Sequence, residues 1–147
     1  MGYALPVFAL CLVIILIAGD AQHHSSEHVR LALQQTQPEQ LAADMLRTAD
    51  VVNNWRHGRS ITDGPVSTAL TGMVPLPDSR IKSIIQNGRL WIWVPETDGV
   101  YAALRARSVT SALALTVSGG RLRMADGTDM NLSLPSGVTE GSIVYLN

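Results

Sequence analysis

An uncharged apolar run near the N-terminus, Ala4–Gly19, constrains this chain more than any other feature. A helix rises about 1.5 Å per residue, so residues 2–19 would extend about 27 Å, close to the roughly 30 Å hydrocarbon core of a bilayer. Pro6 would lie in the first turn, where its missing N–H costs nothing. We therefore expect residues 1–20 to form a transmembrane anchor.

The alternative is a cleaved secretory signal peptide, which has a basic leading region, a shorter apolar stretch and a small-residue cleavage site. Residues 1–3 carry no basic side chain, and the best cleavage candidate, Gly19-Asp20-Ala21, matches poorly, so the sequence favours a retained anchor. The first cation after the run is Arg30, so no basic cluster holds that side in the cytoplasm. We expect the rest of the chain to be exported, which in a bacterium means the periplasm.

The composition of the remaining sequence narrows the class of protein. About 125 residues follow the anchor, enough for one compact domain. The net charge of −1 leaves no basic footprint for nucleic acid. The one cysteine, Cys11, lies in the apolar run, which argues against disulfides and cysteine-rich zinc sites. We expect a polar juxtamembrane linker over residues 21–37 and a soluble domain over residues 38–147.

The soluble domain is predicted to begin with an amphipathic helix that runs from Pro38 to about Gly58. Its apolar residues recur at three- and four-residue spacing on one face: Leu41, Met45, Leu46, Ala49, Val52 and Trp55. A loop-rich passage follows over residues 60–77, within which residues 66–70 fit either a short helix or a strand. Residues 79–86 are then predicted to form a second short helix, capped by Asp78.

The second half of the domain is predicted to be rich in strands. Residues 89–95 alternate aliphatic side chains with Trp91 and Trp93, which predicts a strand, and residues 100–105 are expected to return beside it. Residues 108–118 fit either helix or strand. Further strands are expected at 121–124 and 130–134, around an Asp-Gly turn, and at 141–147. The predicted class is α+β: an N-terminal transmembrane helix, then a long amphipathic helix packed on a mainly antiparallel β-sheet.

Two groups of polar residues bear on catalysis and metal binding. His23, His24, Glu27 and His28 form a metal-like cluster, but a zinc site needs a further supporting shell, so we interpret them as part of a solvated stalk. Asp126, Thr128 and Asp129 loosely match a calcium loop but are explained by a hairpin turn. No nucleophile elbow or triad motif stands out. We expect no metal, no cofactor and no enzymatic activity.

The candidate partner surface consists of Trp91, Trp93, Arg105 and Arg107. Period two places both indoles on the face of their strand opposite Leu90, Ile92 and Val94. Tryptophan is enriched at interface hot spots, and the two arginines are placed to stack on the indoles. The alternative is that a loop or Trp55 covers the indoles, which would make them core residues.

The anchor, the polar stalk, the helix PEQLAADMLRTADVVNNW and the segment GRLWIWVPETDGVYAAL together resemble the PilM family of plasmid-encoded type IVb thin pilus proteins. The resemblance covers nearly the whole chain. It implies an inner-membrane component of the pilus assembly apparatus, acting in conjugative transfer beside other assembly proteins of the inner membrane and periplasm. It does not extend to the larger actin-like cytoplasmic protein that shares the name.

Two other functions stay open at this stage. A long helix in front of an antiparallel sheet also suits a pilin-like minor subunit. A pilin, however, would have a basic leader that ends in Gly and a Glu at the fifth position after it, where this sequence has Val7 after Gly2. A small membrane-anchored periplasmic hydrolase would need a pocket with convergent polar groups. The sequence shows no such group of residues.

Overall fold

The computed structural model describes residues 37–109 and 113–147. Its elements follow in the order long helix (37–56), β1 (Gly64–Pro65), 3₁₀ helix η1 (Thr68–Thr71), β2 (Lys82–Gln86), β3 (Arg89–Val94), α2 (Val100–Arg107), β4 (Ala114–Ser118), β5 (Arg121–Arg123) and β6 (Ile143–Leu146). The expected anchor lies outside the described residues, as does the expected linker apart from Gln37. Among the residues that are described, no helix has both the length and the apolar character to cross a membrane.

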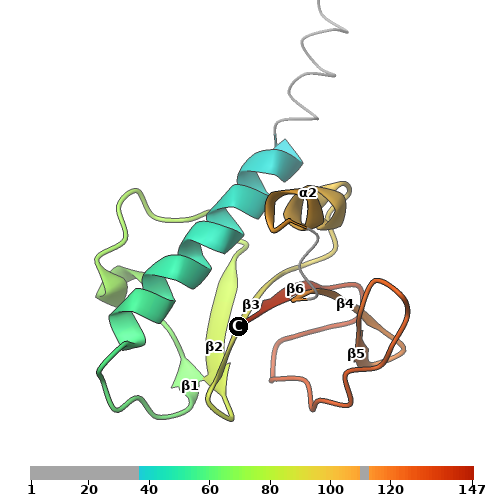
Figure 1. Cartoon of the computed structure of the whole chain (residues 1–147). Coiled ribbons are helices and arrows are strands. Elements are labelled where there is room, and N and C mark those ends of the chain that lie inside the picture. The colour runs from blue at the N-terminus through green and yellow to red at the C-terminus, as the bar shows by residue number, and fades with distance from the viewer. Residues whose placement is uncertain (1–36, 110–112) are drawn as a thin grey trace, which may run out of the picture. The chain divides into compact units, whose positions relative to one another are not determined.

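A single six-stranded sheet organises the domain. Its strand order is β1-β2-β3-β6-β4-β5, and each neighbouring pair is antiparallel. The strand that comes last in the sequence, β6, thus lies in the middle of the sheet (Figure 1). The predicted α+β class and the antiparallel sheet are confirmed for this part of the chain.

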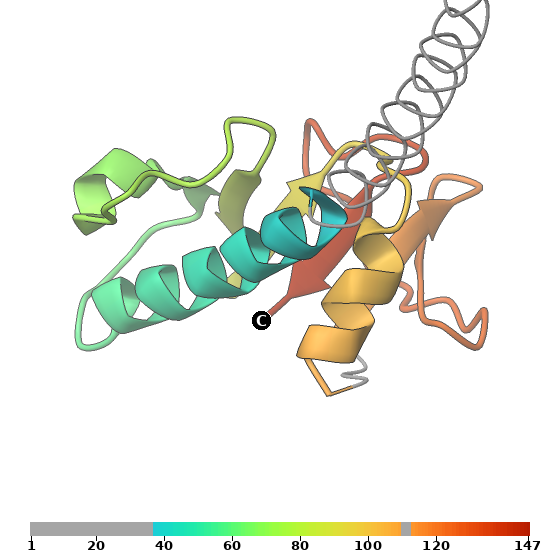
Figure 2. The same ribbon diagram turned by 90° about the horizontal axis from the view of Figure 1, so that it is seen from above.

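The long helix and α2 both cover one face of the sheet (Figure 2). The predicted apolar stripe of the long helix is confirmed for Leu41, Met45, Ala49 and Val52, which are buried, and for Leu46, which packs beside them. These side chains meet Leu90, Ile92 and Val94 of β3, together with Val100, Ala103 and Leu104 of α2. This cluster is the larger part of the core. The last predicted member of the stripe, Trp55, is half-buried and lies outside this cluster.

The opposite face of the sheet is covered by irregular chain instead of helices. Met124, Met130, Leu132, Leu134 and Val138 come from the segment between β5 and β6. They pack on Trp91, Trp93, Leu115, Val117, Leu122, Val144 and Leu146. The central strands are therefore apolar on both faces.

The predicted helix at residues 79–86 is wrong, because β2 occupies most of this segment. Asn87 and Gly88 adopt φ values of 53° and 73°, and Gln86 pairs with Arg89, so the two residues form a tight hairpin turn between β2 and β3. The helical spacing of Ile81, Ile84 and Ile85 has another cause: Ile81 and Ile85 enter the helix-covered core, whereas Ile84 packs on the other face.

The predicted return strand at residues 100–105 is also wrong, because α2 forms there. Val100, Ala103 and Leu104 are buried with the i, i+3, i+4 spacing of a helix face. Gly99 precedes the helix with φ 77°, and a Cβ at this position would lie 3.3 Å from Pro38 Cβ. The start of α2 is therefore packed tightly against the first turn of the long helix.

Three smaller expectations are resolved by the structure. Residues 66–70 contribute to η1, and the ambiguous segment 108–118 forms β4 at its end, while residues 110–112 lie outside the described part. The strand expected at 130–134 is not formed, since this segment is irregular and Arg123 makes only an isolated bridge with Asp129. The strands expected at 89–95 and 141–147 are confirmed as β3 and β6.

Candidate functional site

The two indoles proposed as a partner surface are core side chains in the structure. Trp91 is 2% exposed and Trp93 is 8% exposed. The segment between β5 and β6 covers them, and Trp55 belongs to the helix on the other face. The Trp93 Nε1–H donates to the Gly137 carbonyl at 3.2 Å, whereas the buried Trp91 Nε1–H has no hydrogen-bond partner among the described residues.

The two arginines of the same hypothesis lie on α2, on the opposite side of the sheet from the indoles. The Arg105 guanidinium lies 5.9 Å from the centroid of the Tyr101 ring. The Arg107 Nη2 donates to Glu39 Oε2 at 2.7 Å and links α2 to the long helix. The structure therefore does not bring Trp91, Trp93, Arg105 and Arg107 together on one surface.

A different surface stands out, on the loop that passes beside the long helix. We call residues 68–77 the apolar loop; it includes η1 and is drawn in yellow-green in Figure 1. Leu70, Val74 and Leu76 are 73%, 88% and 63% exposed. Single exposed aliphatic side chains are ordinary, but three within seven residues make a local patch of the kind that marks interaction sites.

The apolar loop is attached to the long helix by Met73. This side chain is buried, and its sulfur lies 3.9 Å from the Thr48 hydroxyl oxygen. Thr48 is itself buried and its hydroxyl donates to the Asp44 carbonyl at 2.7 Å. Met73 thus inserts toward the helix while its neighbours on either side point into solvent.

Arg47 provides a second attachment. Its Nη2 donates to the Pro75 carbonyl at 3.1 Å and lies 3.2 Å from Asp44 Oδ1. The carboxylate of Asp44 therefore holds the guanidinium in position for the loop. Because the loop is fixed at Met73 and Pro75, its exposed aliphatic side chains are presented in an ordered conformation, which lowers the entropy cost of binding.

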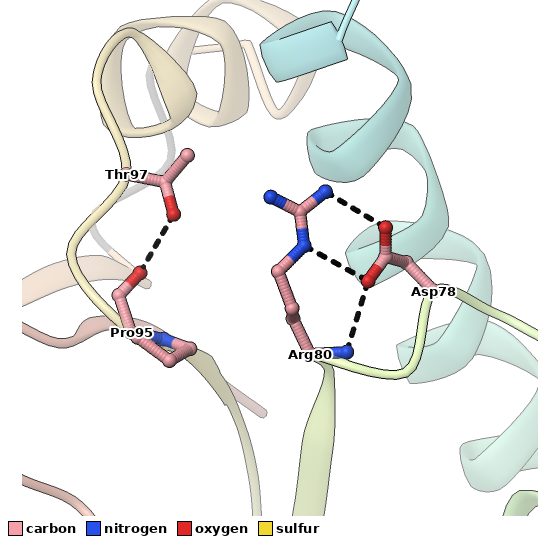
Figure 3. A network of polar contacts seen from close by, with 4 residues as sticks. All are labelled: Asp78, Arg80, Pro95 and Thr97. Carbon is pink, nitrogen blue, oxygen red and sulfur yellow. Dashed lines mark hydrogen bonds and ion pairs between the residues drawn. The ribbon is translucent and has the colours of Figure 1, made fainter.

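An Asp-Arg pair follows the apolar loop directly. Arg80 donates to Asp78 through its backbone N, Nε and Nη2 at 2.9, 3.0 and 2.8 Å (Figure 3). These hydrogen bonds from Arg80 lower the pKa of Asp78 to about 2. In the same view, the Thr97 hydroxyl donates a hydrogen bond to the Pro95 carbonyl at 3.0 Å. The pair fixes the path of the chain from the loop into β2.

The acidic residues that loosely matched a calcium loop make local hydrogen bonds instead. Asp126 Oδ1 accepts from the Thr128 backbone N–H at 2.9 Å, and Asp129 accepts from the Asn131 N–H and from Arg121 Nη1, each at 2.8 Å. These bonds lower the pKa of both carboxyl groups. The described residues contain no group of three or more His, Cys, Asp or Glu side chains placed to hold a metal. The His23–His28 cluster lies outside them.

Sequence reasoning missed the apolar loop because its aliphatic residues follow neither helical nor strand periodicity. The only signal was that Leu70, Val74 and Leu76 fall in a segment with Gly72, Pro75 and Pro77, where apolar side chains have no regular element to bury them.

Comparison with known proteins adds a second line of evidence. No curated protein matches the sequence. A crystal structure described as PilM from Escherichia coli B7A is similar in fold, with a TM-score of 0.65 and 28% sequence identity over 78% of this chain and 94% of that chain. The family model named PilM matches residues 13–146. Since this match spans most of the sequence, and the fold agrees with a PilM structure, the chain belongs to the PilM family.

Proposed function

We propose that this protein is an inner-membrane component of a type IVb pilus assembly apparatus and acts as a scaffold in conjugative transfer. Membership of the PilM family relates it to pilus biogenesis. In this proposal the protein is not an enzyme, and it binds other assembly proteins of the inner membrane and periplasm. The apolar run Ala4–Gly19 anchors it, and residues 38–147 lie in the periplasm.

The observation that supports the scaffold function is the apolar loop, which is held against the long helix. Leu70, Val74 and Leu76 are solvent-exposed although the loop beneath them is held by Met73 and by the Arg47–Pro75 hydrogen bond. Full burial of one such aliphatic side chain contributes about 1.5–3 kcal/mol. A partner that covered all three would gain a substantial part of the free energy needed for a stable contact.

The test replaces the three exposed side chains with serine in the full-length protein (Leu70→Ser, Val74→Ser, Leu76→Ser). We expect pilus-dependent transfer to fall by about tenfold or more, since a loss of 1.4 kcal/mol is already tenfold in an equilibrium constant. The melting temperature should stay unchanged, because none of the three side chains is buried. The matched control changes the same residues to isoleucine, which keeps the apolar surface and should keep transfer.

Normal transfer by the serine variant would contradict a docking role for the apolar loop. An equal fall in transfer by the serine variant and the isoleucine control would contradict a docking role that depends on apolar area. Deletion of the whole gene, measured beside these variants, establishes how far transfer depends on the protein.

A further inference from the structure

The C-terminal end of the long helix borders two adjoining hollows. The larger, of about 470 Å³, is lined by Arg56, His57 and Arg59 among others, and we call it the basic groove. The smaller, of about 190 Å³, is lined by Trp55, Val66 and Leu70 among others, and we call it the apolar hollow. Ile61 and Ile85 line both, so the two hollows are neighbours and together form a depression with arginines on one side and Trp55, Val66 and Leu70 on the other.

The cations of the basic groove are held in place but not neutralised. Arg56 Nη1 donates to the Gly88 carbonyl at 3.3 Å, and the Arg59 guanidinium lies 5.3 Å from the centroid of the Trp55 ring. Within the described residues neither arginine has a carboxylate within 4 Å, whereas Arg47, Arg80, Arg107 and Arg121 each do. Two guanidinium groups are thus presented to an incoming anion.

The neighbouring negative charges do not cancel this arrangement. Asp63 lines the apolar hollow, but its carboxylate is turned to the β2–β3 turn, where it accepts from the Asn87 N–H and from the Gly88 N–H at 3.4 Å. The helix end carries a partial charge of about −0.5, which offsets only part of two full positive charges. The two arginines therefore leave the groove with an excess of positive charge.

We infer that this depression binds a short peptide segment of a partner protein that carries an acidic residue next to an aliphatic one. The carboxylate would pair with Arg56 and Arg59, whose planar guanidinium groups suit bidentate recognition. The aliphatic side chain would enter the apolar hollow beside Leu70. Because Leu70 also belongs to the apolar loop, the two surfaces are continuous, and the inference rests on the proposed scaffold function by naming the chemistry of the partner.

The test is photo-crosslinking of the full-length protein in cells that assemble the pilus. The photo-reactive amino acid replaces Thr62, which is exposed and lines the apolar hollow. The linked peptide, sequenced by mass spectrometry, should contain Asp or Glu within two residues of Leu, Ile or Val. In the Arg56→Glu, Arg59→Glu variant the yield should fall about fivefold or more, because an attractive pair becomes a repulsive one. The control, Lys82→Glu with Arg105→Glu, makes the same change of charge at two residues that line neither hollow and should keep the yield.

The outcomes separate this inference from the proposed function. A crosslink to a second copy of the chain, to a lipid or to a basic peptide would overturn the inference. So would the absence of any adduct, or a crosslinking yield that is the same in the wild type and in the double glutamate variant. Transfer is measured in the same strains. If deletion of the gene leaves transfer intact, the proposed function fails; if deletion abolishes transfer but the double glutamate variant transfers normally, only the inference fails.

Discussion

The two indoles of β3 form a matched pair with one difference between them. Both are buried among the same side chains, yet the Trp93 Nε1–H donates to the Gly137 carbonyl at 3.2 Å, whereas the Trp91 Nε1–H finds no partner in the part of the chain that the structure describes. Changing either to phenylalanine keeps an aromatic ring and removes the N–H. Because the lost volume is the same at both sites, the hydrogen bond should decide the difference in stability.

The magnitude follows from the cost of hydrogen bonds. Trp93→Phe loses a bond that contributes about 1 kcal/mol, whereas Trp91→Phe removes a buried donor whose lack of a partner costs about 1–3 kcal/mol. We therefore expect Trp93→Phe to be less stable than Trp91→Phe by about 2 kcal/mol or more. For a unit of about 110 residues, an unfolding entropy of about 2.1 cal/mol/K per residue converts this difference to about 9 °C.

Thermal melts of the full-length protein in a mild detergent, followed by circular dichroism, measure the difference. Both alanine variants serve as a reference, since emptying either site should cost about 3–5 kcal/mol. Equal melting temperatures for the two phenylalanine variants would refute the reasoning, because they would show that the Trp91 N–H is paired, for example with a buried water.

Three further predictions concern the loop, the charge pair and the topology. Met73→Ala should cost about 2–4 kcal/mol and release the apolar loop, so that limited proteolysis cuts within residues 68–77 under conditions that spare the wild type; equal resistance of both proteins would contradict the anchoring role. Arg80 holds the pKa of Asp78 at about 2 in the fold, against an ordinary value of 3.8. The ionised carboxylate therefore stabilises the fold fully above pH 3.8, and this contribution is lost as the pH falls toward 2. The melting temperature of wild type should therefore exceed that of Asp78→Asn at neutral pH, and the gap should close as the pH falls from about 4 to about 2; a gap that widened in acid would contradict the assignment. A reporter that is active only after export, joined after Asn147 by a flexible linker, should be active; activity of a cytoplasmic reporter alone would reverse the proposed topology.

The features that the sequence predicts well are those that repeat along one element. Period two in residues 89–94 predicts β3 and also separates its aliphatic face from its indole face. The spacing of Leu41, Met45, Ala49 and Val52 predicts the buried face of the long helix. In both cases one element carries the whole pattern, so no knowledge of its neighbours is needed.

The errors arise where two covered faces meet on one strand. Ile84 and Ile85 are adjacent in β2 and enter opposite clusters, so the segment loses the alternation expected of a half-buried strand and imitates a helix. The Asn-Gly pair at 87–88 was the better signal, because it favours a tight hairpin whatever the pattern around it. In α2 the helical spacing of Val100, Ala103 and Leu104 extends over only five residues. The turn residues that precede this segment favoured a hairpin with a return strand instead.

The candidate surfaces depend on contacts that a linear pattern does not contain. Whether Trp91 and Trp93 are exposed is decided by the segment around residues 124–138, which has no periodicity of its own. The exposure of Leu70 and Val74 depends on how Met73 and the Pro75 carbonyl attach the loop to the long helix, because these contacts decide which side chains turn inward. Such arrangements are set by tertiary packing.

The central position of β6 has a consequence for biosynthesis. The strands β1, β2 and β3 form one half of the sheet and β4 and β5 form the other, and only β6 is hydrogen-bonded to both. The ribosome reaches residues 143–146 after the other five strands of this sheet have been made, so until then β3 and β4 lack the strand that pairs with both. Cooperative folding of this domain should therefore wait for β6, because only this strand joins the two halves of the sheet into one hydrogen-bonded unit.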